Sequence, residues 1–122
     1  MTFEGATPDG VTGESVRSMF ATITEVNQKR AQSGKLYREF LRVPAMSVGL
    51  YVLPAGATDP QRPHHEDEVY YVIRGGARFR AGNDDHEVSA GTVLFVAAEV
   101  EHSFHDIAEE LSVLVFFAPA ES

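Results

Sequence analysis

Cysteine is absent from the 122 residues of this sequence. Its absence excludes disulfide bonds, thiolate nucleophiles, zinc–sulfur sites and iron–sulfur clusters. Any metal ion bound by the chain must therefore be held by histidine, aspartate or glutamate. These ligands suit one divalent ion of iron, manganese, zinc, nickel or copper.

Positive charge is scarce, because 10 lysines and arginines stand against 18 aspartates and glutamates and the formal net charge is −8. Nucleic acids and anionic membranes are bound through basic patches that neutralise phosphate. We therefore expect neither as a partner. The same charge places no such limit on a small-molecule ligand.

Long apolar runs are also lacking, since no stretch approaches the roughly 18 residues of a membrane-spanning helix. The first ten residues, MTFEGATPDG, have neither the basic start nor the apolar core of a signal peptide. A cytoplasmic protein is the expectation. The length suits one domain, and 43% hydrophobic residues are enough to build a core.

The N-terminal region, residues 1–35, is predicted to be an arm followed by a short helix. Residues 1–13 are rich in Gly, Thr, Pro and Asp and are expected to be loose. From Glu14 to about Gln32, apolar residues recur on one helical face, which we expect to pack on the protein body or on a second subunit. These residues are Val16, Met19, Phe20, Ile23 and Val26. Gly34 is the expected stop of the helix.

Residues 36–122 are predicted to form a β-barrel, because the apolar pattern changes to short β-rich runs. Strands are expected at 48–53, 69–73, 77–81, 92–97 and 111–118. Gly75-Gly76 is expected to end the second run, and Gly82–Asp85 to form a hairpin turn. Short strands with no helix between them indicate an all-β sandwich or barrel.

The segment RPHHEDEVYY, Arg62–Tyr71, crowds two histidines and three carboxylates next to an apolar strand. Residues two apart share a face of a strand, so His64 and Glu68 are expected to face one interior. A buried charge is costly unless it has a partner. A divalent metal ion is one such partner, and a hydrogen-bonded acid pair is another.

His102, in the stretch EHSFHDI, follows a second apolar run. It would converge with His64 and Glu68 if the two strands lie in facing sheets. Periodicity alone leaves that open.

The first of two spaced patterns runs from Gly56 through Arg62, His64 and Glu68 to Gly75, with five, one, three and six residues between them. It resembles the first motif of the cupin superfamily, G-x5-H-x-H-x3/4-E-x6-G.

The second pattern runs from Gly91 through Ala97, Glu99 and His102 to Asp106, with five, one, two and three residues between them. It resembles the second cupin motif, G-x5-P-x-G-x2-H-x3-N. Two motifs in register are far more specific than either alone, and the resemblance extends over residues 50–119.

The resemblance implies a double-stranded β-helix of the jelly-roll type, often dimeric, with a metal ion inside the barrel. Carried over by position, the implied metal ligands are His64, Glu68 and His102. Arg62 stands where the family has its first histidine, and a guanidinium cannot ligate a metal. The implied set is thus reduced to three, with Gln61, His65 or water as a fourth ligand.

The second motif departs from the family at two positions. Ala97 replaces proline, and Glu99 replaces a glycine that would permit a positive-φ turn. Glu99 must then adopt that conformation under strain, or the turn must differ.

Several further residues have an expected place. Tyr70 and Arg62 are candidate catalytic residues, as proton donor and as anchor for a substrate carboxylate. Gln61, Tyr51 and Phe104 are expected to line the pocket, although aromatic residues there also serve as plain core. Glu66 and Asp67 are expected on a solvated bend. Arg78 and Arg80 share a strand face and reach either outward to acidic neighbours, which is the expectation, or inward to bind an anionic substrate.

Two functions fit these features. The first is a metal-dependent enzyme of the dioxygenase, isomerase or decarboxylase type, acting on a small molecule. The second is a non-catalytic module that binds a small molecule or metal. In the second case hydrogen bonds alone would hold the polar cluster, and Arg62 would pair with Glu68. A storage role fits poorly with one short barrel.

Overall fold

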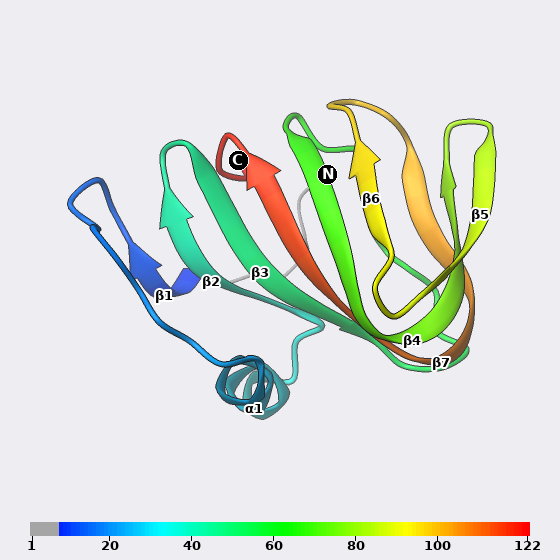
Figure 1. Ribbon diagram of the computed structural model, residues 1–122, viewed down its shortest axis with the longest axis horizontal. Coiled ribbons are helices and arrows are strands. Elements are labelled where there is room, and N and C mark those ends of the chain that lie inside the picture. Colours follow the sequence, from blue (N-terminus) through cyan, green and yellow to red (C-terminus); the bar gives the residue numbers. More distant parts are fainter. Residues whose placement is uncertain (1–7) are drawn as a thin grey trace.

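The computed structural model describes residues 8–122, which form seven strands and one helix (Figure 1). The elements are β1 Pro8–Thr12, α1 Ile23–Ser33, β2 Tyr37–Val43, β3 Met46–Leu53, β4 Asp67–Ala81, β5 Asp84–Ser89, β6 Val93–Val96 and β7 His102–Ala118. The predicted all-β class with a short N-terminal helix is confirmed. No helix among these residues is both long and apolar enough to cross a membrane.

The strands form one curled sheet in the order β1-β2-β3-β7-β4-β5, with β6 paired to β4. Two long strands, β4 and β7, pair with each other at both of their ends. The first half of β4 also pairs with β6, and its second half pairs with β5. Each long strand therefore takes part in two faces of the curl, which is visible as the bend of β4 and β7 in Figure 1.

Gly75 bends β4 and does not end it, so the expected break between 69–73 and 77–81 is wrong. The register against β7 shifts at three points from Val72 to Arg78. Gly75 has φ +101°, and a Cβ there would meet the Glu110 carbonyl oxygen at 2.3 Å. The glycine thus allows β7 to approach closely where β4 turns from one face to the other. The predicted hairpin after Ala81 is confirmed.

The N-terminal predictions need two corrections. Pro8–Thr12 is not loose but pairs in parallel with β2, and the remainder of the expected arm, residues 1–7, lies outside the described residues. The helix begins at Ile23 and not near Glu14, because the Thr22 side chain accepts the Glu25 N–H as an N-cap. Gly34 ends it as predicted, with φ 74°.

Only Val26 of the expected apolar stripe is buried in the helix. It packs on Leu50 and Val52 of β3, so α1 covers the outer face of the sheet. Phe20 precedes the helix and is 95% exposed.

The main core fills the inside of the curl and surrounds the polar side chains described below. It contains four fully buried aromatic side chains, Tyr51, Tyr70, Phe104 and Phe117. Because β4 and β7 bend around the curl, every second side chain along each of them points into this interior.

Candidate metal centre

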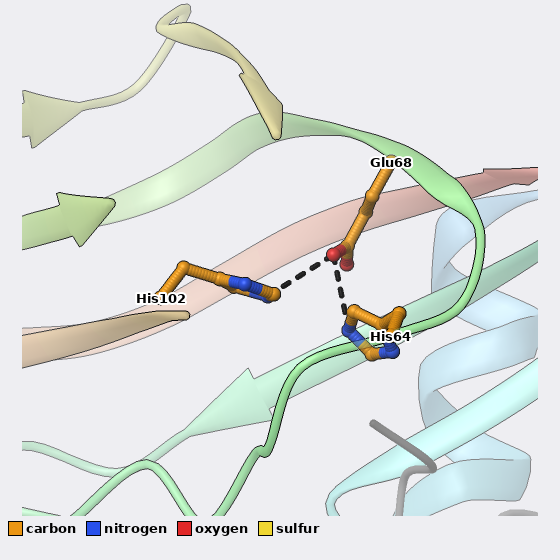
Figure 2. A group of neighbouring side chains, drawn as sticks. All are labelled: His64, Glu68 and His102. Atoms are coloured by element: carbon orange, nitrogen blue, oxygen red, sulfur yellow. Dashed lines mark ion pairs between the residues drawn. The ribbon is translucent and has the colours of Figure 1, made fainter. Parts of the chain in front are cut away.

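Three side chains from three parts of the chain converge inside the curl (Figure 2). Glu68 is the second residue of β4, His102 is the first residue of β7, and His64 lies in the loop that leads into β4. Glu68 pairs with Phe117 and His102 with Ala81, at opposite ends of the β4–β7 ladder. The curl of the sheet therefore brings His102 to Glu68.

All three side chains are buried: His64 is 2% exposed, Glu68 is 1% exposed and His102 is 4% exposed. One possible ligand atom from each lies within 4.8 Å of the other two. Glu68 Oε1 is 3.0 Å from His64 Nε2 and 3.1 Å from His102 Nε2. The structure thus brings together the three residues implied as metal ligands.

The contact made by Nδ1 of His102 fixes which of its two ring nitrogens carries the hydrogen. Nδ1 lies 2.8 Å from the carbonyl oxygen of Val100, which can only accept, so Nδ1 carries a hydrogen. In the neutral ring, Nε2 then presents a lone pair toward the Glu68 carboxylate. Two lone pairs facing each other at this distance repel, so a cation, either a proton or a metal ion, belongs between them.

The carboxylate of Glu68 supports the same conclusion. Both of its oxygens are buried, and Oε1 lies between the Nε2 atoms of the two histidines. Such a carboxylate is costly unless a positive charge compensates it. Two imidazoles and one carboxylate are a donor set that holds divalent iron and related metals, so these residues fit a metal ion.

The pKa directions show how these groups behave when only protons are present. Burial alone would raise the pKa of Glu68, but contacts with His102 and His64 outweigh it and lower the pKa below 4.5. Burial would likewise lower the pKa of His64, but Glu121 and Glu68 raise it above 6.5. Without metal, the centre therefore favours an ionised Glu68 beside a protonated His64.

Gln61 and Tyr70 border the centre. The Tyr70 hydroxyl donates to Gln61 Oε1 at 2.6 Å and lies 3.2 Å from His102 Nε2. Gln61 Oε1 is itself 3.3 Å from His64 Nε2. Burial, followed by the charges of Glu68 and Asp59, holds the pKa of Tyr70 well above 10, so the hydroxyl keeps its proton.

Asp59 organises this border and was missed in the sequence analysis. Its carboxylate accepts hydrogen bonds from the Tyr51 hydroxyl at 2.6 Å, the Gln61 side chain at 2.7 Å and the Phe104 amide at 2.9 Å. The only sequence signal was a carboxylate in the proline-containing loop TDPQRP beside the first motif. Tyr51 and Phe104 are thus buried beside the centre, where both bond to Asp59 and the Phe104 ring also packs on Tyr70.

Arg62 is exposed and does not enter the histidine–glutamate cluster. It lines a pocket of about 760 Å³ together with Gln61, Arg80 and His102. The pocket thus adjoins the centre through His102. Arg80 also pairs with Asp85, at 2.9 Å. Arg78 reaches the same carboxylate at 3.3 Å, so both arginines pair with an acidic neighbour as expected, and Arg80 in addition lines the pocket.

Glu99 adopts the positive φ that its place in the motif demands, with φ 70°. Its amide donates to the His64 carbonyl at 2.7 Å, and its carboxylate lies 2.7 Å from His65 Nδ1. The strained turn thus holds the loop that carries His64. His65 is exposed and does not approach the cluster.

Glu66 is buried, so the expectation of a solvated bend is wrong for this residue. Its carboxylate accepts the Ser122 amide at 3.1 Å, which is a long-range contact that no local pattern could indicate. Asp67 is exposed as expected and accepts the Ala98 amide.

A buried histidine–glutamate cluster inside a curled seven-stranded sheet is the arrangement that the cupin resemblance implied. The family model "Cupin domain" matches residues 49–117, which is more than half of the chain. The chain therefore belongs to the cupin family.

Individual proteins show the same likeness. An uncharacterized protein of Streptomyces coelicolor is 48% identical over 100 residues, which cover 82% of this chain and 95% of that protein. An RmlC-like cupin with a double-stranded β-helix fold from Methanocaldococcus jannaschii superposes with a TM-score of 0.62 at 19% identity, covering 68% of this chain and 78% of that one.

The DMSP lyase DddQ of Ruegeria pomeroyi superposes with a TM-score of 0.59 at 21% identity, covering 65% of this chain. The match spans about 40% of that enzyme's length. At these identities the likeness to solved structures establishes the fold alone.

Proposed function

We propose that this protein is a metal-dependent cupin enzyme that binds one divalent ion through His64, Glu68 and His102 and acts on a small molecule in the adjoining pocket. One observation carries the proposal. Two imidazole nitrogens converge on one buried carboxylate oxygen, at 3.0 and 3.1 Å. A divalent ion compensates this set of electron-pair donors.

The bound ion would supply Lewis acidity or, if redox-active, oxygen activation. Gln61 Oε1 would be a fourth protein donor, because it lies 3.3 Å from the same His64 nitrogen that faces Glu68. Iron, manganese, zinc, nickel and copper all suit two imidazoles with oxygen donors. We infer that the substrate is a small, oxygen-rich molecule of the kind on which dioxygenases, isomerases or decarboxylases act.

Tyr70 is proposed as the proton donor. Its hydroxyl holds a proton that Gln61 Oε1 accepts, and it lies within 3.2 Å of His102 at the wall of the centre. A substrate oxygen that replaced Gln61 as the acceptor would receive a hydrogen bond from Tyr70.

Arg62 is proposed to bind an anionic group of the substrate at the pocket. Its guanidinium stays charged and can take a carboxylate through two parallel hydrogen bonds. Its exposed position suits orientation of the substrate and excludes a direct role at the metal ion.

Elemental analysis of untagged protein tests the proposal first. We expect close to one metal ion per chain in the parent after reconstitution, and loss of that ion in His64→Ala and in His102→Ala. His65→Ala is the matched control, because His65 is the sequence neighbour of His64 but is exposed. It should retain the metal.

Full metal occupancy in His64→Ala would show that the centre is assigned wrongly. A parent that takes up no metal would leave the non-catalytic binding module as the function to pursue. If metal binds, Tyr70→Phe should lower kcat in a substrate screen, with metal content unchanged.

A further inference from the structure

Glu121 brings a second carboxylate to the centre from the segment that follows β7. It is 4% exposed, and its Oε2 lies 3.5 Å from Nδ1 of His64. Nδ1 is the ring nitrogen that faces away from Glu68. His64 therefore lies between two carboxylates, with one near each ring nitrogen.

The main chain of residues 120–122 is held by four hydrogen bonds. The amides of Ala120, Glu121 and Ser122 donate to the Pro44 carbonyl, the Ser47 hydroxyl and the Glu66 carboxylate, respectively. Arg42 Nη2 donates to the Glu121 carbonyl at 2.6 Å. All four bonds use main-chain atoms of the segment, so none of them involves the Glu121 carboxylate.

The two histidines of the centre are held in comparable ways. His102 donates its Nδ1 hydrogen to the Val100 carbonyl, which directs Nε2 at Glu68. His64 has a carboxylate oxygen on the same side of its ring. Metal-binding histidines ordinarily donate their second N–H to a carboxylate or a carbonyl, which fixes the tautomer and increases the basicity of the binding nitrogen.

We propose that Glu121 is a positioning residue of the centre, whose carboxylate holds the hydrogen on His64 Nδ1 and so keeps Nε2 directed at Glu68 and at the metal ion. The role in metal binding rests on the function proposed above, whereas the orientation of His64 does not. At 3.5 Å the contact is at the upper limit of a hydrogen bond, but in a buried site the negative charge still stabilises the Nδ1 hydrogen. Glu121 also adds a second negative charge near a divalent ion.

Two measurements on Glu121→Ala test this proposal. The first is titration of the metal-free protein with Co²⁺, followed by visible absorption. The variant should bind Co²⁺ at least about tenfold more weakly than the parent, since removing such outer partners typically lowers metal affinity 10- to 100-fold. In ¹⁵N-edited NMR of the metal-free protein, the parent should show a protected Nδ1–H signal of His64. The variant should lose this signal.

Ser47→Ala is the matched control, because it removes the acceptor of the Glu121 amide and leaves the Glu121 carboxylate in place. This variant should have a lower thermal midpoint of unfolding than the parent. Its Co²⁺ affinity should stay within about twofold of the parent, a far smaller change than the one expected for Glu121→Ala. Glu121→Gln, which keeps side-chain size and an acceptor oxygen, should restore part of the affinity.

Parent-like Co²⁺ affinity and an unchanged Nδ1–H signal in Glu121→Ala would overturn the proposal. An equal loss of affinity in Ser47→Ala and Glu121→Ala would also overturn it, because docking of the segment alone would then explain the effect. If the parent itself binds no Co²⁺, the proposed function fails. In that case the NMR signal alone decides whether Glu121 orients His64.

Discussion

Single residues in the two motifs work through backbone geometry as much as through their side chains. Glu99 has φ 70°, a conformation that favours glycine, yet its amide and carboxylate both hold the His64–His65 turn. Gly75 has φ +101° and lies against the main chain of Glu110 and Leu111. Glu99 thus holds the loop that carries His64, and Gly75 allows β4 and β7 to approach each other.

Gly75→Ala should destabilise the protein by roughly 2–4 kcal/mol, because a positive φ and a main-chain clash act together. Gly91→Ala is its control. Gly91 also has a positive φ, 93°, but a Cβ there meets nothing within 4 Å. Its cost should be nearer 1 kcal/mol, from backbone strain alone. Urea unfolding of both variants measures the difference, and equal losses would show that the contact with Glu110 is unimportant.

At the scale of elements, the outer faces of the two ends of the sheet differ. Helix α1 covers β3 through Val26. Further along the sheet, the paired strands β4 and β6 expose Tyr71, Val93 and Phe95, which are 41%, 65% and 64% exposed. β6 is also a strand with an unpaired edge among the described residues. This face is where we expect the interface of the homodimer that the family resemblance implies.

Phe95→Lys should convert that dimer to a monomer, because a charge would be buried in an apolar interface. Light scattering coupled to size-exclusion chromatography measures the mass. Phe20→Lys is the comparison variant, since Phe20 is an equally large exposed residue outside the β4–β6 face; loss of the dimer in that variant alone would place the interface on the N-terminal segment. A parent that is already monomeric, or a Phe95→Lys variant that stays dimeric, would contradict the expectation.

At the scale of the whole molecule, the centre links protonation, metal binding and stability. A lowered Glu68 pKa contributes stability above its ordinary value of 4.5, and this contribution is lost as pH falls through the lowered value. A raised His64 pKa contributes stability below its ordinary value of 6.5, and this contribution is lost as pH rises through the raised value. Both contributions are complete between these two ordinary values.

We therefore expect the part of the stability of the metal-free protein that comes from the centre to decline above neutral pH, and thermal melts at a series of pH values measure this decline. A divalent ion should reverse the decline, because it binds the deprotonated imidazoles in place of the proton. His64→Ala should remove the decline and the response to metal together. A metal-free parent whose pH profile matches that of His64→Ala would refute this linkage.

The amino-acid sequence by itself indicated the fold class, and its resemblance to the two cupin motifs pointed to His64, Glu68 and His102 as one cluster. Short apolar strands with turns between them indicated a β-sandwich or barrel, and the spacing of His64, Glu68 and His102 matched the family motifs. Both signals are local or depend on fixed spacing, because a strand places every second side chain on one face.

The tertiary structure alone decided what surrounds those three residues. Asp59 acts through Tyr51, Gln61 and Phe104, while Glu121 reaches His64 from 57 positions further along the chain. Neither contact leaves a periodic pattern, because each depends on how far β4 and β7 bend and on where the segment after β7 docks. The same bending explains why Gly75 continues a strand that a local reading would end there.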